Sequence, residues 1–171
     1  MADTAITGVA AAAQINEPLI RVEGLRKSFG SLEVLKGIDL SVNPGEVVTI
    51  IGASGSGKST FLRCLNLLET PDAGHIWFHG QDLTAERCNI NKLREDIGMV
   101  FQGFNLFNNM TVLENCMVGQ VKVLGKNKVD AHKSAMNYLE KVGMAPYINA
   151  KPRQISGGQK QRVAIARALA M

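Results

Sequence analysis

The apolar and polar positions along the chain follow two patterns, short runs typical of strands and longer stretches with helical spacing. Five short apolar segments lie between turn residues and are predicted to be strands: residues 19–22, 34–42, 47–51, 76–78 and 97–101. The segment 47–51 (VVTII) is rich in β-branched residues and lies between glycines. A strand of this composition is expected to be buried on both faces of a sheet.

Helical spacing covers three other stretches. Leu62, Leu65 and Leu68 recur at helical intervals within residues 60–68, and the pattern returns over 111–147, with loops expected near Gly125 and Gly143. A final helix is predicted from Gly157 to the end of the chain, because this stretch is rich in alanine and Ser156 is a suitable N-cap.

Composition indicates a folded protein. The chain has 171 residues, of which 46% are hydrophobic and 20% charged, enough for one domain, or one domain with a small lobe, around a buried core. No run of about 18 uncharged apolar residues occurs, so no membrane-spanning helix is predicted. Residues 1–18 are rich in alanine and lack a basic segment, which favours a flexible N-terminal tail over a signal peptide.

The net charge of +4 comes from one end of the chain. Residues 141–171 hold six of the 19 basic residues and none of the 15 acidic ones. Aromatic residues do not interleave with these basic side chains beyond Tyr147, so no nucleic-acid partner is predicted.

The cysteines and histidines lack the spacing of metal ligands. An odd number of cysteines without paired spacing favours reduced, structural thiols in a cytoplasmic protein. The histidines are predicted to be surface residues. These six residues are Cys64, Cys88, Cys116, His75, His79 and His132.

Residues 52–59 (GASGSGKS) fit the P-loop pattern G-x-x-x-x-G-K-[ST], between a predicted strand and a predicted helix. Glycines let backbone N–H groups turn toward phosphate oxygens, and the helix N-terminus adds a positive dipole end. Lys58 would supply a cation for the β- and γ-phosphates, and Ser59 a hydroxyl ligand for Mg²⁺. The candidate nucleotide-binding residues are Gly52, Ser54, Gly55, Ser56, Gly57, Lys58, Ser59 and Thr60.

A second motif, ISGGQ at residues 155–159, precedes a basic stretch and the last predicted helix. A Ser hydroxyl and Gly amides at a helix start form an anion site, although the same residues also suit an ordinary capped helix. In combination with the P-loop, the motif resembles the LSGGQ signature of ATP-binding-cassette (ABC) transporter ATP-binding subunits. The resemblance extends over residues 20–171.

The resemblance implies an α/β fold: an incomplete P-loop NTPase core of the ABC ATPase type, with an antiparallel β lobe and a helical lobe. It implies four parts. They are a flexible tail (1–18), the nucleotide-binding core with the β lobe (19–102), the helical lobe (103–156) and the signature helix (157–171).

The resemblance also assigns roles to residues outside the P-loop. Phe29 stands where the family has an aromatic residue that stacks on adenine, more often Tyr. Gln102 matches the Q-loop glutamine, which reaches Mg²⁺ and the attacking water. The catalytic residues implied are therefore Gln102 and Lys58, and the implied metal ligands are Ser59 and Gln102. The signature residues, which act on the ATP of a partner subunit, are Ser156, Gly157, Gly158 and Gln159.

The segment after Gln102 resembles subunits that serve polar amino acid uptake. Its sequence is close to FQQFNLFPHMTVLEN, with Gly103 in place of Gln and residues 108–109 (NN) in place of Pro-His. The apolar residues Phe104, Leu106 and Phe107 fit either a simple core or a surface that receives a helix of the membrane subunit. The second reading is favoured, because exposed apolar patches usually mark a contact.

In the family, the next element is an apolar strand that ends in Asp-Glu, followed by a switch histidine. No carboxylate residue follows Glu140 in this sequence, and Glu95-Asp96 precedes its apolar segment in the wrong order. The resemblance therefore implies a C-terminally truncated cassette that lacks the water-positioning glutamate. An exposed sheet edge and exposed apolar surface are expected as a result.

The predicted function is that of an ATP-binding subunit of an ABC importer, which couples ATP binding and hydrolysis to polar amino acid uptake. The resemblance implies ATP and Mg²⁺ as ligands. It implies a second ABC ATP-binding subunit in a head-to-tail dimer, a transmembrane permease and, indirectly, a solute-binding protein as partners. The chain would lie at the cytoplasmic face of the inner membrane as a peripheral subunit.

Two alternatives stay open. One is a short protein that binds nucleotide or a partner without hydrolysis. The other is a non-transport ABC ATPase that acts on DNA or the ribosome, against which the uptake-type sequence around Gln102 speaks.

Overall fold

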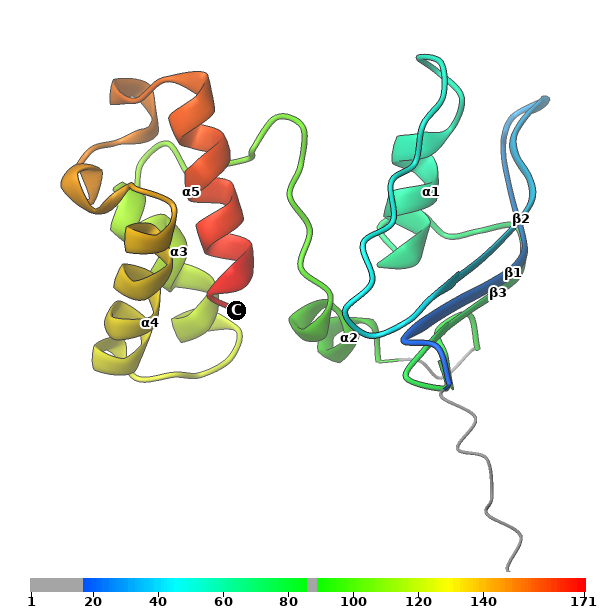
Figure 1. The fold of residues 1–171 in the computed structure, drawn as a ribbon, viewed down its shortest axis with the longest axis horizontal. Helices are drawn as coiled ribbons and strands as arrows, with labels where there is room; N and C mark the ends of the chain where they lie inside the picture. Colours follow the sequence, from blue (N-terminus) through cyan, green and yellow to red (C-terminus); the bar gives the residue numbers. More distant parts are fainter. Residues whose placement is uncertain (1–16, 86–88) are drawn as a thin grey trace, which may run out of the picture. The chain divides into compact units, whose positions relative to one another are not determined.

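The computed structural model describes residues 17–85 and 89–171 of the chain. These residues form two compact units, Met1–Cys88 and Asn89–Met171, and each is described by itself (Figure 1). Most of the tail predicted for residues 1–18 falls outside the described residues, as does Cys88.

The first unit is built on an antiparallel sheet. Its strands are β1 (Ile20–Phe29), β2 (Leu32–Val42), β3 (Ala73–Phe78) and β4 (Gln81–Asp82), in the order β2-β1-β3-β4. Neighbouring strands all pair antiparallel, which confirms the predicted antiparallel β lobe. β1 is longer than the predicted strand 19–22, because irregularities in its pairing between Val22 and Ser28 interrupt the alternation of apolar and polar residues.

The helix α1 (Lys58–Leu65) starts earlier and ends earlier than the predicted helix 60–68. It ends at Asn66, whose side-chain oxygen accepts the N–H of Leu68 at 3.2 Å. The leucines at helical spacing do not form its buried face: Leu62 is exposed, and the helix buries Phe61 and Cys64. The buried apolar residues of the first unit are Val22, Leu25, Leu35, Phe61, Cys64, Ile76 and Leu83.

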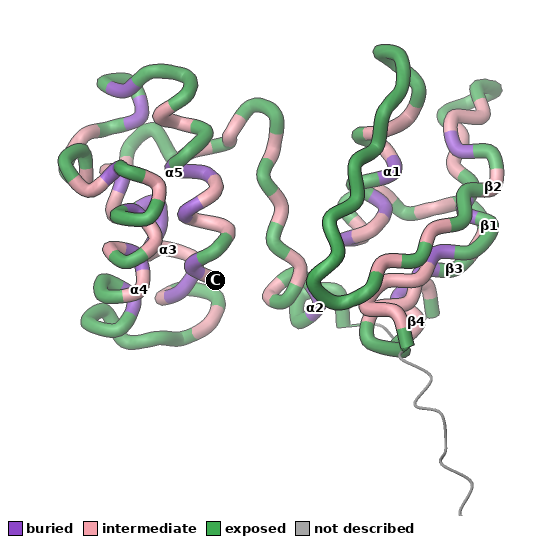
Figure 2. The backbone as a smooth tube through the Cα atoms, in the orientation of Figure 1, coloured by how far each residue is buried: buried purple, intermediate pink, exposed green. Residues whose placement is uncertain are grey.

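Two predicted strands are absent from the part of the chain that the structure describes. Residues 47–51 form no strand, and Val47 and Ile51 are 90% and 89% exposed. Figure 2 shows residues 43–56 as one exposed stretch. Residues 97–101 are also irregular, and Val100 is exposed. A buried strand needs partners for its ladder of hydrogen bonds, and no strand in the described ranges pairs with either segment.

The second unit is helical. It contains α2 (Ile90–Asp96), α3 (Val112–Lys122), α4 (Lys128–Lys141) and α5 (Gly157–Leu169), with short 3₁₀ turns at Ala145–Tyr147 and Pro152–Gln154. The helices predicted within residues 111–147 and from Gly157 are confirmed, whereas α2 was not predicted. Helices α3, α4 and α5 pack on one another. Their shared core consists of Val112, Cys116, Ala135, Leu139, Met144, Ile155, Val163 and Ala166.

Side chains close the starts of these helices. Thr111 Oγ1 accepts the N–H of Glu114 at 3.2 Å, and Glu114 Oε2 accepts the N–H of Thr111 at 2.7 Å, which forms a capping box. Asn127 caps α4 by accepting the N–H of Asp130 at 2.9 Å. The predicted N-cap Ser156 is confirmed at the start of α5.

Candidate nucleotide-binding site

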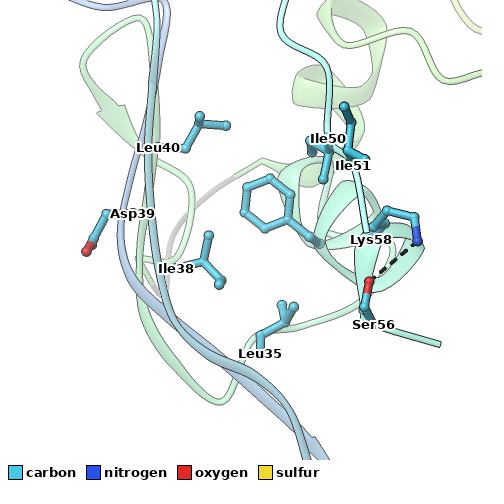
Figure 3. Close-up of a pocket in the computed structure, with 10 residues that line it drawn as sticks. Leu35, Ile38, Asp39, Leu40, Ile50, Ile51, Ser56 and Lys58 are labelled. Carbon is cyan, nitrogen blue, oxygen red and sulfur yellow. Dashed lines mark hydrogen bonds between the residues drawn. The ribbon is translucent and has the colours of Figure 1, made fainter. Parts of the chain in front are cut away.

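The loop before α1 wraps around the ammonium group of Lys58. Lys58 Nζ donates to the carbonyl oxygen of Gly52 at 2.8 Å and to that of Ala53 at 2.6 Å. It also lies 3.4 Å from Ser56 Oγ, a contact drawn in Figure 3. The side chain of the first helical residue thus folds back over the loop, and its positive charge is held within the turn.

The backbone of this loop passes close to other atoms at two of its glycines. Gly57 precedes α1 with φ +90°, and a Cβ there would lie 2.8 Å from Val34 Cγ1 and 3.1 Å from Leu35 Cδ2. At Gly52 a Cβ would lie 2.9 Å from Ser56 Oγ. The backbone therefore approaches both β2 and the far side of its own loop more closely than a side chain would permit.

The start of α1 is suited to an anion. The first turn of α1 contains no acidic residue, and Gly57 supplies no side-chain cap. The positive end of the helix dipole is therefore not neutralised by a side chain of this turn, and its first N–H groups can bind an anion. Ser54 and Ser59 are exposed, and their hydroxyls are accessible. A lysine cation, a helix N-terminus and a nearby hydroxyl oxygen fit a phosphate chain, with Ser59 as a hard ligand for Mg²⁺.

An apolar cavity of about 200 Å³ lies next to this loop, and no pattern in the sequence indicated it. Figure 3 shows Leu35, Ile38 and Leu40 of β2 facing Ile50 and Ile51. The cavity wall also contains Lys58 and Phe61 of α1. The lining of the cavity is mostly aliphatic, so the cavity does not provide the polar contacts of an anion site. The phosphate chain would bind at the neighbouring loop instead.

Phe29 lies at the end of β1, with 48% of its surface exposed. Lys27 Nζ lies 5.4 Å from the centroid of its ring. Lys27 is itself paired with Asp72 at 3.0 Å and with Glu69 at 3.4 Å, and Asp72 Oδ2 accepts the N–H of Ser28 at 2.6 Å. The sequence analysis missed this cluster, because Asp72 is 45 positions from Lys27.

The bonds around Asp72 favour its charged form. The hydrogen bond from the Ser28 amide, followed by that from Lys27, lowers the pKa of the Asp72 carboxyl below its usual 3.8. The hydrogen bond to Asp72, and to a lesser degree that to Glu69, raises the pKa of the Lys27 ammonium group above its usual value. Both groups are therefore ionised at neutral pH.

Gln102 belongs to the second unit and is exposed in a turn. The two residues that follow Gly103 have left-handed backbone angles, with φ +61° at Phe104 and +47° at Asn105. Arg167 of α5 donates to both of their carbonyl oxygens, at 2.8 Å to Phe104 and 2.7 Å to Asn105. The loop after Gln102 is thus fixed to α5.

A buried amide side chain fixes the next part of this loop. Asn115 of α3 is fully buried; its Oδ1 accepts the N–H of Phe107 at 2.7 Å, and its Nδ2 donates to the carbonyl oxygens of Phe107 and Thr111 at 3.1 and 2.9 Å. Leu106 packs against the helical core, whereas Phe107 is 48% exposed. The apolar group after Gln102 is therefore divided between core and surface, whereas the sequence favoured a surface for the whole group.

The residues of the ISGGQ motif form the start of α5. Ser156 Oγ accepts the N–H of Gln159 at 3.3 Å, and Gln159 Oε1 accepts the N–H of Ser156 at 2.8 Å. Gly157 and Gly158 are exposed, and a Cβ on either would have no other heavy atom within 4 Å. The helix start thus presents two backbone amides without side-chain cover.

Residues 52–60 and Phe29 belong to the first unit, and Gln102 and residues 156–159 belong to the second. Over residues 17–85 and 89–171, no helix has the length and apolar character needed to cross a membrane.

These features define an α/β protein of the P-loop type, with an antiparallel β lobe and a helical lobe. The model of the family described as ABC transporter matches residues 35–171. The chain therefore belongs to the ABC transporter family.

Two curated relatives show what the sequence is similar to. The arginine transport ATP-binding protein ArtM of Bacillus subtilis (strain 168) is 56% identical over 153 residues, covering 90% of this chain and 64% of its own length. The nopaline permease ATP-binding protein P of Agrobacterium fabrum (strain C58) is 49% identical over 166 residues, with 91% and 65% covered. The chain thus spans less than two-thirds of the length of these relatives.

The fold is similar to solved ABC cassettes. The dimeric structure of MJ0796, a bacterial ABC transporter cassette, matches with a TM-score of 0.82 and 36% identity, over 88% of this chain and 69% of that one. A dimeric post-hydrolysis state of MJ0796 bound to ADP and Pi matches with a TM-score of 0.80, also at 36% identity. The predicted fold class is confirmed by these matches.

Proposed function

We propose that this chain is the nucleotide-binding part of an ABC importer ATPase that drives uptake of a polar amino acid. The observation that carries the proposal is the folded loop 52–57, whose carbonyl oxygens hold the Lys58 ammonium beside an acid-free helix start. The amino acid class is supported by the relatives, one named for arginine transport and one for a nopaline permease.

In this proposal the phosphates of ATP bind at the start of α1. Lys58 releases the loop carbonyls and contacts the β- and γ-phosphate oxygens, since a phosphate oxygen is a stronger partner for an ammonium group than a neutral carbonyl. The loop amides and the dipole of α1 add to the binding, and Ser59 contributes a hydroxyl ligand for Mg²⁺. The bound ion withdraws charge from the phosphate oxygens.

The remaining roles follow the family. Phe29 stacks on the base, and Gln102 helps to hold the ion and the attacking water. The α5 start, with its uncovered Gly157 and Gly158 amides, contacts the nucleotide of a second ABC subunit in a head-to-tail dimer. A permease and a solute-binding protein complete the transporter, with this chain as a peripheral subunit on the cytoplasmic side. The dimeric state of the similar cassette supports the pairing.

The test is a calorimetric titration of the purified chain with Mg-ATP. We expect weak but measurable binding, because the second phosphate-contacting surface comes from a partner subunit. Lys58→Ala should weaken it by at least about 10-fold, as expected for a lost charge-assisted contact of roughly 1.5–3 kcal/mol. Lys36→Ala, at an exposed lysine of β2, is the matched control and should bind normally. Equal affinity in the Lys58 and Lys36 variants would contradict the proposal.

A further inference from the structure

The surroundings of Phe29 suggest that its ring is held in place by charged residues from another part of the chain. Phe29 is the last residue of β1, opposite Leu32 and next to the two-residue turn into β2. A half-exposed ring at such a position would be free to change rotamer unless other contacts fixed it.

Two hydrogen bonds restrict the residues before the ring, and Asp72 accepts both. The backbone N–H of Ser28, immediately before Phe29, donates to Asp72 Oδ2 at 2.6 Å. The other carboxylate oxygen of Asp72 accepts from Lys27 Nζ at 3.0 Å. One side chain, between Pro71 and Ala73, thus bonds both residues that precede the ring.

Lys27 in turn lies over the ring. Its ammonium group is 5.4 Å from the centroid of Phe29 and is held there by Asp72 and by Glu69 at 3.4 Å. Only 13% of the Lys27 side chain is exposed, although a free lysine would extend into solvent. A cation over a ring is attracted to its π-electrons, and it leaves the opposite face of that ring for another group.

We infer that Asp72, with Lys27 and Glu69, is a positioning residue that holds Phe29 as a one-faced stacking platform for the base of the nucleotide. The inference rests on the proposed nucleotide-binding function, in which Phe29 stacks on the base, and adds the residues that hold the ring in place. Asp72 touches neither the base nor the phosphates; it acts through the backbone before Phe29 and through the ammonium group on the closed face of the ring. Its contribution therefore depends on the presence of a base in the ligand.

The experiment compares Mg-ATP with Mg-tripolyphosphate, which has the phosphate chain but no base, in calorimetric titrations of the full chain. Asp72→Ala should weaken Mg-ATP binding about 5-fold, the lower end of what base–aromatic stacking contributes, and leave tripolyphosphate binding unchanged. Asp82→Ala is the matched control: Asp82 also bonds a backbone amide of this unit, that of Thr84 at 2.8 Å. In the sheet, Asp82 lies opposite Trp77, and Trp77 lies opposite Arg21 of β1. Arg21 is eight residues from Phe29, so Asp82 is roughly 25 Å from the ring along the strand direction.

A double-mutant cycle separates positioning from stability. In a Phe29→Ala background, Asp72→Ala should cause no further loss of ATP affinity, because the platform is already gone. If Asp72→Ala does not fold, Lys27→Met, which keeps most of the length of the side chain and removes its charge, replaces it with the same expectation. Equal losses for both ligands, or a loss that persists without Phe29, would overturn the inference. Lys58→Ala tests the proposed function separately: it should weaken both ligands, and an effect on neither would refute nucleotide binding itself.

Discussion

Arg167 holds the backbone of Asn105: its Nη1 lies 2.7 Å from the Asn105 carbonyl oxygen, although 62 positions separate the two residues. The second nitrogen of the same guanidinium donates to the carbonyl oxygen of Phe104 at 2.8 Å. Burial lowers the pKa of the Arg167 guanidinium from its ordinary value, because the charged group loses part of its hydration there. The loop after Gln102 and the helix after the ISGGQ motif are thus joined by one planar group.

Replacement of Arg167 should therefore loosen this loop and destabilise the second unit. Hydrogen bonds from a charged donor contribute about 1.5–3 kcal/mol, so Arg167→Ala should lower the free energy of unfolding by roughly this amount. Arg167→Lys should recover less than half of the loss, because an ammonium group cannot span two consecutive carbonyls as a guanidinium fork does. Urea denaturation measures both variants, with Arg162→Ala, an exposed arginine of the same helix, as the control. Equal stability of the Arg167 and Arg162 variants would refute the claim.

The cap of α5 should be measurable in the same way. Ser156→Ala removes the acceptor for the Gln159 N–H, and such a change in an N-cap lowers stability by about 1 kcal/mol. Ser134→Ala, in the interior of α4, is the matched control and should be neutral or slightly stabilising, since alanine is the better helix former. A smaller effect at Ser156 than at Ser134 would show that this capping box does not hold the helix start in solution.

Acid should weaken the start of α3. The amide of Thr111, then its hydroxyl, lowers the pKa of the Glu114 carboxyl below its usual 4.5. A carboxyl with a lower pKa in the folded state stabilises fully above its unfolded-state pKa, and this stabilisation is lost as the pH falls through the folded-state value. The free energy of unfolding should therefore fall between pH 6 and pH 3. The decline should be shallower in Glu114→Gln, whose amide does not titrate; parallel curves for the two proteins would contradict this assignment.

The two described cysteines should be unreactive in the native state. Burial raises the pKa of the Cys64 thiol to about 11 and that of Cys116 to about 12, so neither is a thiolate at pH 8. Labelling with iodoacetamide, read by site-resolved mass spectrometry, should proceed at Cys64 and Cys116 only at the rate of unfolding. Rapid labelling of either thiol in the absence of denaturant would mean that its helix opens more readily than its burial indicates.

The exposed segment 47–51 should promote self-association. Val47 is 90% exposed within a run of apolar, mostly β-branched residues that has no strand partner among the residues described. Such a segment tends to pair with other chains, and one charge in it usually blocks this. Val47→Lys should therefore lower the light scattering of concentrated solutions. Leu32→Lys, at an exposed apolar residue of the β1–β2 hairpin, is the control and should have a smaller effect.

Local features of this protein could be predicted from its sequence, and the helices are the clearest case. The start of α5 followed from Ser156 and the alanines behind it, because a cap and helix propensity act within one turn. The P-loop conformation was likewise encoded by its glycines, two of which lie where a Cβ would collide with other atoms. These predictions required no knowledge of distant residues.

The errors concern interactions between distant positions. Residues 47–51 have the composition of a buried strand, but a strand forms only when another segment supplies ladder partners. The Lys27–Asp72 pair and the Arg167 contacts join positions 45 and 62 or more apart, and no periodicity in the sequence connects them. The role of Asn115 could not be predicted either, because nothing in the sequence distinguishes a buried asparagine that bonds a loop from an asparagine on the surface.

The two glycines of the ISGGQ motif are not required by this chain's own packing. Neither Gly157 nor Gly158 has a left-handed backbone, and a side chain on either would project into open space. Replacing glycine by alanine where the native backbone accepts it stabilises a protein by about 0.4–1 kcal/mol, so the isolated chain would be more stable with alanine at both positions. Under the proposed function, the motif is a trade-off between helix stability and access to the backbone. The missing side chains make the helix less stable, and they leave its backbone open to close approach by another molecule.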